Sequence, residues 1–500
     1  MTDKRWWTLL ALLVVLTLVR VATTHRVFAQ TIDESAHLIA GYDALTKRVF
    51  TTDTMHPPLA RMLFALPFVN EPEPGAEPRG NKLLLRDDRY TQNVARARMG
   101  NLLFLAIGIL AVALWARRLL SPAAGLLAAA LYACLPPILA HAGLATTDMA
   151  AAATLPLALY ALTLLLDEAS WPRTIALGAA VALGLLCKYS FVLYFPACAV
   201  VLFAMRRRFP IARLLVTIAI AVILVAMVMP PREYIAGVLQ VQAMNADPPK
   251  AILFGEVKKG GWWYYFPLAL FFKTPIAFLA LALLGCTRKR EPAIIAAVIL
   301  GIAMTSSINI GVRHLLPLYA PLAIAAAAVR VRWLVLACTA WLVIGSALAH
   351  PDYLPWFNAL AGREPQRVLN DSNLDWGQDV LRLVRLARDE KLPSITTSLA
   401  TNAPLDQLGF PPRQDLAPFQ PVHGWVAISE LNIALGRDLS PEIQRWLDDL
   451  LRGRPYRRVG HSIRLYHFPR PASVAAIACH PERESRDLGG WGRAARAMVR

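Results

Sequence analysis

The chain has 500 residues, of which 56% are hydrophobic and only 17% are charged, whereas soluble domains carry about a quarter charged residues. Apolar runs of about 20 residues, enough to cross a bilayer as a helix, recur along the chain and argue against a soluble protein. The net charge is +18, and residues 1–350 hold 32 basic against 17 acidic residues. These basic clusters lie between apolar runs, so they fit membrane topology and lipid headgroups, and no nucleic-acid partner is expected.

The apolar runs predict an all-α polytopic membrane module over residues 1–350, with about eleven transmembrane helices. The expected spans are 6–23, 98–116, 120–143, 148–166, 173–187, 189–205, 211–230, 263–285, 292–309, 314–329 and 332–349. No small-residue cleavage site follows the first span, so we expect it to remain as a signal anchor. The fifth and sixth spans are short and meet at residues 188–190, which indicates a hairpin.

Short basic clusters set the expected orientation of this module. The clusters are 4–5, 117–118, 206–208, 288–290 and 330–332, and all of them fall on one side under this count of spans. The positive-inside rule makes that side cytoplasmic. The loop 24–97, the loop 231–262 and everything after about residue 350 then face outward.

The sequence changes character after residue 350. Helix-like stretches at 379–390 and 441–452 and strand-like stretches at 424–429 and 461–468 predict a small α/β domain over residues 351–470 on the outer face. Residues 471–500 are rich in Arg and have no apolar periodicity, so they are predicted to form a disordered tail.

Carboxylates stand at the outer ends of two spans. Asp33 and Glu34 follow the first span by about ten residues, and Asp148 opens the fourth span. A carboxylate at the membrane surface can act as a general base on an attacking hydroxyl. Acidic residues at a helix start also cap the helix or stabilise its dipole, and the residues alone leave both interpretations open. His56 and Arg61 follow in the same outer loop, where the two prolines after His56 stop a helix or open an interfacial one.

Four basic side chains lie near the same predicted membrane boundary. They are Lys188 at the turn of the hairpin, Lys273 inside the eighth span, and Arg313 with His314 at the start of the tenth. Charges at such depth cost a few kcal/mol each and usually line a cavity or pair with another group. Together they would suit a phosphate, although Lys188 and Arg313 could instead snorkel to the surface.

Several kinds of site have no signal in this sequence. No phosphate-binding glycine loop, dinucleotide fingerprint or H-E-x-x-H motif is visible, which leaves the substrate itself or an ion gradient as the energy source. The outer acids could hold a divalent metal, but no ligand spacing supports one, and no cofactor is predicted. The six cysteines form neither a metal motif nor a disulfide framework.

The order of short motifs resembles that of the GT-C glycosyltransferases that use polyprenyl-phosphate sugars, namely the protein O-mannosyltransferases and the aminoarabinose transferases of lipid A. The motifs are Asp-Glu in the first outer loop, His-Pro-Pro-Leu, Thr-Thr-Asp-Met, Lys-Tyr-Ser, Lys-Thr-Pro and Arg-His-Leu-Leu-Pro. The resemblance covers residues 6–350, and the stretch NDSNLDWGQDVLRL is similar to that of bacterial members of the group. The sugar-binding repeats of some eukaryotic members are not found.

This resemblance implies a function for the candidate residues. Asp33 would be the catalytic base with Glu34 beside it, Asp148 would lie near the acceptor, and the outer Lys and Arg residues would hold the lipid phosphate. The implied partners are a polyprenyl-phosphate sugar donor, a protein, lipid or glycan hydroxyl acceptor, and membrane lipids. The reaction would invert the anomeric centre, in the inner membrane of a bacterium, with the α/β domain in the periplasm.

Two other functions compete with this one. A transporter or lipid-linked-sugar flippase would use the acids and Lys273 as a coupling relay, but its ionisable groups would be expected near the midplane, often within repeats. A membrane scaffold without catalysis would leave Lys273 and the Asp-Glu loop unexplained. Under the transferase hypothesis, the loop 231–262 would be a mobile lid over the donor.

Overall fold

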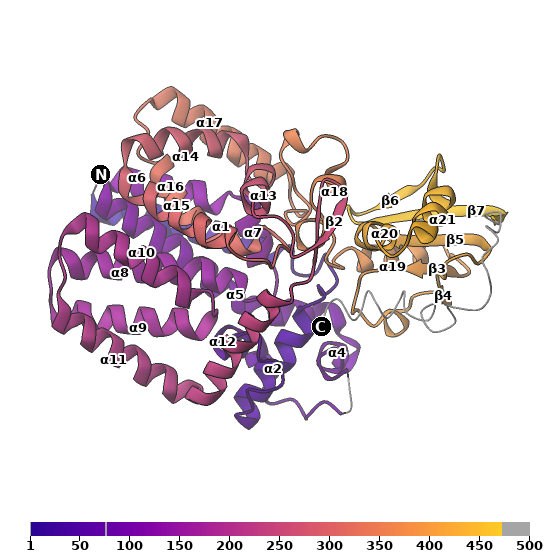
Figure 1. Cartoon of the computed structure of the whole chain (residues 1–500), viewed down its shortest axis with the longest axis horizontal. Helices are drawn as coiled ribbons and strands as arrows, with labels where there is room; N and C mark the ends of the chain where they lie inside the picture. The colour runs from indigo at the N-terminus through magenta and orange to yellow at the C-terminus, as the bar shows by residue number, and fades with distance from the viewer. Residues whose placement is uncertain (1, 76–77, 473–500) are drawn as a thin grey trace.

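In the computed structural model, which describes residues 2–75 and 78–472, a helical bundle joins a separate α/β layer (Figure 1). Of the predicted tail at 471–500, residues 473–500 lie outside these residues, and residues 471–472 belong to the last strand. The bundle helices are α1 (Asp3–Ala22), α5 (Tyr90–Leu119), α6 (Pro122–Ala133), α7 (Pro136–Ala142), α8 (Asp148–Asp167), α9 (Trp171–Cys187), α10 (Phe191–Arg206), α11 (Ile211–Val228), α13 (Tyr265–Lys273), α14 (Ile276–Arg288), α15 (Arg290–Met304), η3 (Val312–Leu318), α16 (Tyr319–Ala326) and α17 (Arg332–Leu348).

A helix lies at each of the expected spans, but not every one is long enough to cross a bilayer alone. Among the described residues, α1, α5, α8 and α11 have both the length and the hydropathy, and the bent pairs α6–α7 and α13–α14 raise the number to six if each pair is one span. The pairs bend by 67° and 118°. The mostly helical membrane fold therefore agrees with the sequence, while the number of eleven spans stays a prediction.

The end of the bundle opposite the α/β layer carries a network of ion pairs, here called the basic end. Arg117 pairs with Asp3 at 2.8 Å, and Asp167 pairs with Arg118 at 2.7 Å and with Arg206 at 2.6 Å. Two of the five basic clusters, 117–118 and 206–208, thus meet at one end of the bundle, and Asp3 brings the adjoining cluster 4–5 to the same end, as the positive-inside argument requires of them.

The loop 24–97, which was expected to face outward, forms short elements within its described residues at the other end of the bundle, next to the α/β layer (Figure 1). These are α2 (Glu34–Lys47), α3 (Pro58–Ala65), η1 (Leu66–Phe68), α4 (Arg79–Leu85) and η2 (Arg86–Asp88). Gly41 allows α2 to cross α3 closely, because a Cβ there would lie 2.0 Å from the carbonyl oxygen of Arg61. The expected lid loop forms α12 (Pro231–Ala246) and a hairpin of β1 (Lys250–Leu253) and β2 (Glu256–Lys259).

The α/β layer is a five-stranded mixed sheet in the order β4-β3-β5-β7-β6. Its strands are β3 (Ile395–Ser398), β4 (Arg413–Asp415), β5 (Val422–Ser429), β6 (Arg457–Val459) and β7 (Ile463–Ala472), and its helices are α19 (Val380–Asp389), α20 (Glu430–Arg437) and α21 (Pro441–Leu451). The chain reaches it through η4 (Ala359–Ala361), α18 (Pro365–Val368) and η5 (Asp371–Asn373), and η6 (Leu405–Leu408) follows β3.

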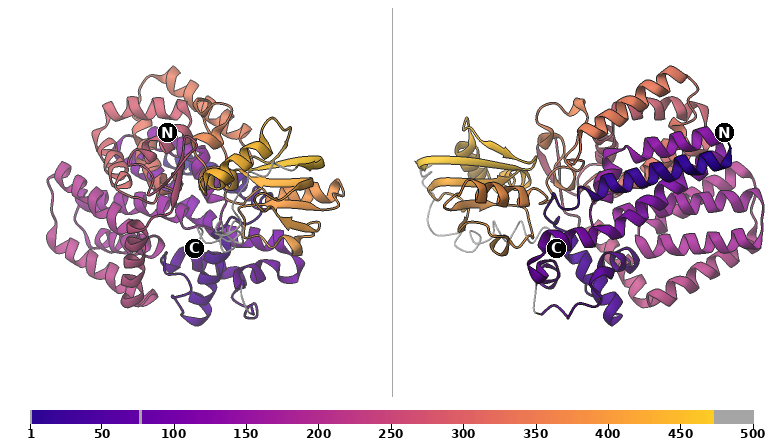
Figure 2. Two further views of the ribbon diagram at one scale, coloured as in Figure 1. Left: turned by 45° about the vertical axis from the view of Figure 1, so that its right-hand side comes forward. Right: turned by 180° about the vertical axis from the view of Figure 1, so that it is seen from behind.

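Side chains along the central strands point alternately to the two faces of the sheet, and each face has its own small hydrophobic core. Ala427 and Leu465 face α19 on one side of the sheet, while Val426 and Tyr466 face α20 and α21 on the other. Strands β3, β4 and β5 are parallel, and β5–β7 and β7–β6 are antiparallel. Figure 2 shows this layer beyond one end of the bundle from two further directions.

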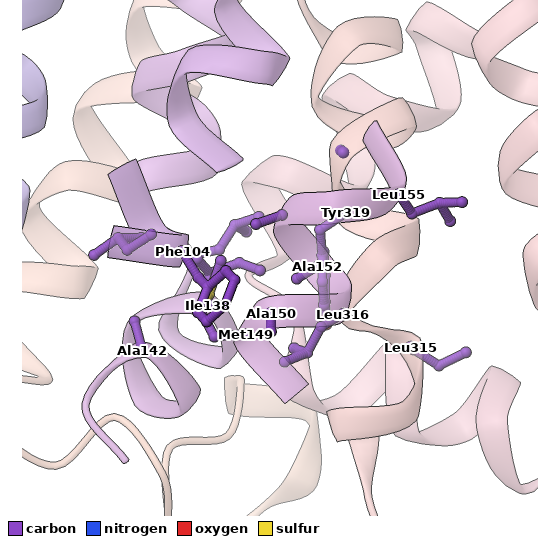
Figure 3. Close-up of a cluster of buried hydrophobic side chains, with 14 of the residues drawn as sticks. Phe104, Ile138, Ala142, Met149, Ala150, Ala152, Leu155, Leu315, Leu316 and Tyr319 are labelled. Atoms are coloured by element: carbon purple, nitrogen blue, oxygen red, sulfur yellow. The ribbon is translucent and has the colours of Figure 1, made fainter. Parts of the chain in front are cut away.

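A compact apolar floor lies beneath the loops at that end of the bundle. Figure 3 shows Phe104 of α5, Ile138 of α7, Met149 of α8 and Leu316 of η3 packed together. Charged residues adjoin this floor in the sequence, since Asp148 precedes Met149. The floor therefore fixes the starts of α8 and η3 relative to each other, and with them the charged side chains that they carry.

Candidate active site

A single guanidinium lies between two of the candidate acids. Arg313 Nη1 donates to Asp33 Oδ2 at 2.8 Å and lies 4.0 Å from Asp148 Oδ2. These three residues come from η3, from the start of α2 and from the start of α8, which are separated by more than a hundred residues of chain. Neither carboxylate caps its own helix, so the capping interpretation is not what the structure shows for their side chains.

The two acids differ in exposure. The Asp33 side chain is 27% exposed, whereas that of Asp148 is 3% exposed and is enclosed by further polar groups. The ammonium of Lys188 donates to Asp148 Oδ1, and His141 Nδ1 lies 4.0 Å from Asp148 Oδ2. Asp33 is therefore the acid that an incoming group could reach, and Asp148 is the acid that neutralises buried cations.

The two cations of this cluster, Lys188 and Arg313, have donors to spare. The Nε of Arg313 is buried and has no hydrogen-bond partner within the described part of the chain. For Lys188, Asp148 is the only partner found in that part. An ammonium has three donors and a guanidinium has five, so both groups could bind an additional anion without giving up every existing contact.

An aromatic ring covers Arg313. The guanidinium carbon lies 4.3 Å from the ring centroid of Trp376, and the same ring lies 6.0 Å from that of His141. His314, the neighbour of Arg313, contacts the ring of Phe266 at a centroid distance of 6.1 Å, and its carbonyl oxygen accepts a hydrogen bond from Tyr194. Trp376 lies in the stretch NDSNLDWGQDVLRL, where the sequence alone gives no signal for this contact.

Glu34 points away from its neighbour Asp33. Its carboxylate binds Arg98 through two hydrogen bonds of 2.7 and 2.8 Å and also accepts from the backbone N–H groups of Thr31 and Ala145. Burial raises the pKa of Glu34, but Arg98 and these hydrogen bonds outweigh it and hold the pKa below its ordinary value. Glu34 therefore ties the first outer loop to α5 and to the segment before α8.

All three N–H donors of the Lys273 ammonium have partners. Its ammonium donates to the backbone carbonyls of Leu354, Trp356 and Asn373 at 2.8, 2.5 and 2.7 Å. It ends α13, where Pro275 prevents a continuous helix. Because an ammonium has only three donors, Lys273 fastens residues 354–373 to the bundle in this structure and has none left for a phosphate.

His56 and Arg61 lie beside the cluster on a different set of contacts. Arg61 pairs with Asp53 at 2.9 Å and donates to the carbonyl oxygen of His56. The rings of His56 and His37 are 4.9 Å apart, and His56 Nδ1 lies 3.4 Å from the Thr147 hydroxyl, next to Asp148. Burial, aided by nearby cations, lowers the pKa of His56 well below its ordinary value, so a neutral imidazole lines this side.

The structure therefore divides the expected residues into two groups. Asp33, Asp148, Lys188 and Arg313 form one charged cluster, with His56, Arg61 and His314 at its edges. Glu34 and Lys273 lie in neighbouring contacts that hold backbone segments. Within the described residues no group of three or more His, Cys, Asp and Glu side chains is arranged to hold a metal ion.

Comparisons with known proteins concern the fold of the chain and one segment of its membrane part. Residues 91–231 match the family model described as dolichyl-phosphate-mannose-protein mannosyltransferase. No curated protein sequence matches the chain. The solved structures of ArnT from Cupriavidus metallidurans, one in the apo state and one bound to undecaprenyl phosphate, are similar to it with TM-scores of 0.51 and 0.50 and 14% identity. Each alignment covers 96% of this chain and 100% of the other.

A third similar structure is the arabinofuranosyltransferase AftD from Mycobacteria. It has 15% identity and a TM-score of 0.39, over 94% of this chain and 40% of that one. The ArnT similarity shows a shared fold, and the family match covers a segment of the membrane module. The chain is an integral membrane protein with the GT-C fold, and its expected resemblance to GT-C glycosyltransferases that use polyprenyl-phosphate sugars is confirmed.

Proposed function

We propose that this protein is a membrane glycosyltransferase that moves a sugar from a polyprenyl-phosphate donor to a hydroxyl acceptor. The observation that carries the proposal is the convergence of Asp33, Asp148, Lys188 and Arg313 from four separate parts of the chain. In this structure two cations and two carboxylates neutralise each other. A lipid phosphate can then enter by replacing carboxylate contacts, which lowers the cost of leaving these charges buried.

The proposed reaction uses each member of the cluster in a separate role. The bond between the anomeric carbon and the phosphate oxygen breaks, and the lipid phosphate leaves with both bonding electrons. Lys188 and Arg313 stabilise the negative charge that grows on this leaving group. Asp33 accepts the proton of the acceptor hydroxyl as its oxygen bonds to the anomeric carbon. Attack from the side opposite the phosphate inverts the anomeric centre.

Arg313 links the two halves of this mechanism. In this structure it is paired with Asp33, and a carboxylate held by a cation is a weaker base. A phosphate that attracts Arg313 would loosen this pair and release Asp33 for proton transfer. The more buried Asp148 would remain the counter-ion of Lys188. His56, Arg61 and His314 would shape the edges of the site, and Glu34 and Lys273 would position the segments that build it.

The remaining assignments follow from the same proposal. The basic end would face the cytoplasm and the α/β layer the periplasm of a bacterial inner membrane. The helix α12 and the β1–β2 hairpin would form the lid over the donor. The turn of this hairpin is joined to the segment leading to the α/β layer, because Phe254 donates its backbone N–H to the carbonyl oxygen of Val368. The acceptor would be a hydroxyl of a protein, a lipid or a glycan.

The test is transfer from a labelled polyprenyl-phosphate sugar in membranes that contain the wild-type protein or Asp33→Asn. We expect the substitution to reduce release of lipid phosphate by at least about 100-fold, the usual contribution of a general base. Asp87→Asn is the matched control, because Asp87 is an exposed carboxylate of the same outer loop. Equal release by wild type and Asp33→Asn would contradict the proposal, as would movement of the intact lipid-linked sugar without its cleavage.

A further inference from the structure

The segment Asn370–Gln378, between the bundle and the α/β layer, is built into the charged cluster. Ile32, just before Asp33, donates its backbone N–H to the carbonyl oxygen of Trp376 at 3.1 Å. On the other side of the cluster, Asn373 Oδ1 accepts from the backbone N–H of Val312 at 2.9 Å. This segment thus touches the residues that precede both Asp33 and Arg313.

Ser372 of this segment packs closely against Ile310 and Gly311, which lead into η3. The Ser372 hydroxyl donates to the carbonyl oxygen of Ile310 at 2.5 Å. A Cβ at Gly311 would lie 2.2 Å from the same hydroxyl oxygen, so no larger residue fits there without displacing Ser372. The backbone of η3 is therefore held by the segment immediately before Arg313.

The indole of Trp376 acts on the charged end of the same side chain. Trp376 is 2% exposed, and the Arg313 guanidinium lies over its face at 4.3 Å. A long side chain such as Arg loses considerable rotamer freedom when it is fixed in one position. A flat ring beneath the guanidinium restricts its positions without using any of its N–H donors. One of these donors binds Asp33, and the buried Nε–H has no partner within the described residues.

The other face of this segment is fastened to the α/β layer. Asp375 Oδ2 accepts from the backbone N–H of Leu431, and Asn370 Nδ2 donates to the carbonyl oxygen of Glu430. Both partners follow the end of β5, so the carboxyl ends of the parallel strands face the cluster. The α/β layer is therefore in a position to fix the segment, and the segment to fix Arg313.

We propose that Trp376 is a positioning residue of the transferase site, which holds the Arg313 guanidinium in place for the phosphate of the lipid donor. The inference rests on the proposed function, because it assigns a phosphate to Arg313. It goes further in making the segment Asn370–Gln378, and through it the α/β layer, a part of the phosphate site.

The test measures binding of undecaprenyl phosphate alone to the purified full chain, for wild type, Trp376→Leu and Trp376→Phe. We expect Trp376→Leu to weaken binding about 5- to 30-fold, the size of a desolvated cation–π contact. Trp376→Phe keeps a ring and is expected to restore most of the affinity. Melting temperatures of each variant report whether the fold is intact.

A double-mutant cycle separates positioning from general structural damage. If Trp376 acts through the guanidinium, Trp376→Leu should change binding less than about twofold in an Arg313→Gln background, because coupled residues are not additive. An effect of the same size in both backgrounds would overturn the inference, and so would wild-type affinity in Trp376→Leu. If the wild type itself neither binds the lipid phosphate nor transfers sugar, the proposed function fails instead.

A second variant keeps the inference testable if Trp376→Leu does not fold. Gly311→Ala places a methyl group where the Ser372 hydroxyl lies, so this hydroxyl must move away from the carbonyl oxygen of Ile310. We expect the loss of this contact before Arg313 to weaken lipid-phosphate binding at least about threefold. Its matched control is Gly345→Ala, where the added Cβ would lie 3.9 Å from the nearest side chain. Unchanged binding in Gly311→Ala would count against the role of the segment.

Discussion

Replacement of Asp148 by Asn should lower the stability of the protein and raise its affinity for a lipid phosphate. Asp148 is nearly inaccessible, binds the Lys188 ammonium, and lies 4.0 Å from Arg313. Removal of its charge takes away the carboxylate that binds Lys188 and leaves Arg313 paired with Asp33. Breaking a buried ion pair from one side costs about 3–5 kcal/mol, and a unit charge at 4 Å contributes about 4 kcal/mol at an effective dielectric constant of 20. We therefore expect unfolding of the ligand-free variant to become easier by about 3–5 kcal/mol.

A phosphate would compensate the cations that this change leaves unpaired. If about 1.4–2.8 kcal/mol of the lost attraction is regained, undecaprenyl phosphate should bind about 10- to 100-fold more tightly to Asp148→Asn. Transfer should nevertheless fall, because product release becomes slower and the site is less ordered when empty. The assay is thermal unfolding of the purified protein with and without the lipid phosphate, together with a direct titration.

The matched control lies at the other end of the same helix. Asp167 closes α8 and pairs with Arg118 and Arg206 at the basic end. Asp167→Asn should also reduce stability but leave lipid-phosphate affinity within about twofold. The reasoning is refuted if Asp148→Asn melts like the wild type, or if it binds the lipid phosphate more weakly.

Two further predictions concern the segments around the site. Glu34→Gln should destabilise the protein by about 3–5 kcal/mol, because it leaves Arg98 buried without its partner. Transfer per folded molecule should stay close to that of the wild type. A wild-type melting temperature in this variant would contradict the prediction. Burial raises the pKa of Asp375 to about 7, so the folded state binds a proton that the unfolded chain releases above about pH 4. Stability should therefore fall by about 1.4 kcal/mol from pH 6 to pH 8, and Asp375→Asn should show a smaller fall in its melting temperature over this interval, whereas an equal fall would refute the assignment.

Much of the membrane part could be predicted because its physical signal is local. The hydropathy of a 20-residue window needs no information about neighbours, and a helix lies at each of the expected spans. Where a span is broken, as at Lys273, Thr274 and Pro275, the sequence shows the proline but not the 118° bend. At that bend, Asn358 from a distant part of the chain donates to the carbonyl oxygens of Phe271 and Thr274.

The candidate residues were found by charge at an expected membrane boundary, and this criterion cannot distinguish a ligand site from a structural contact. Asp33 and Glu34 are adjacent and chemically alike, yet one binds Arg313 and the other binds Arg98. A rotation of 100° per residue along a helix sends neighbouring side chains to different partners. Trp376 gave no signal because an aromatic residue in a loop resembles any other until its distance to Arg313 is known.

The sequence by itself determined the membrane class, the positions of the apolar segments and the set of charged residues near one boundary, since these follow from composition and order along the chain. The tertiary structure alone decided which charges neutralise one another, that Lys273 fastens backbone rather than facing free space, and that the segment before the α/β layer covers Arg313. Such pairings depend on distances of a few ångström between residues that lie from 40 to 280 positions apart in the chain, and Coulomb attraction in a buried site changes steeply over that range.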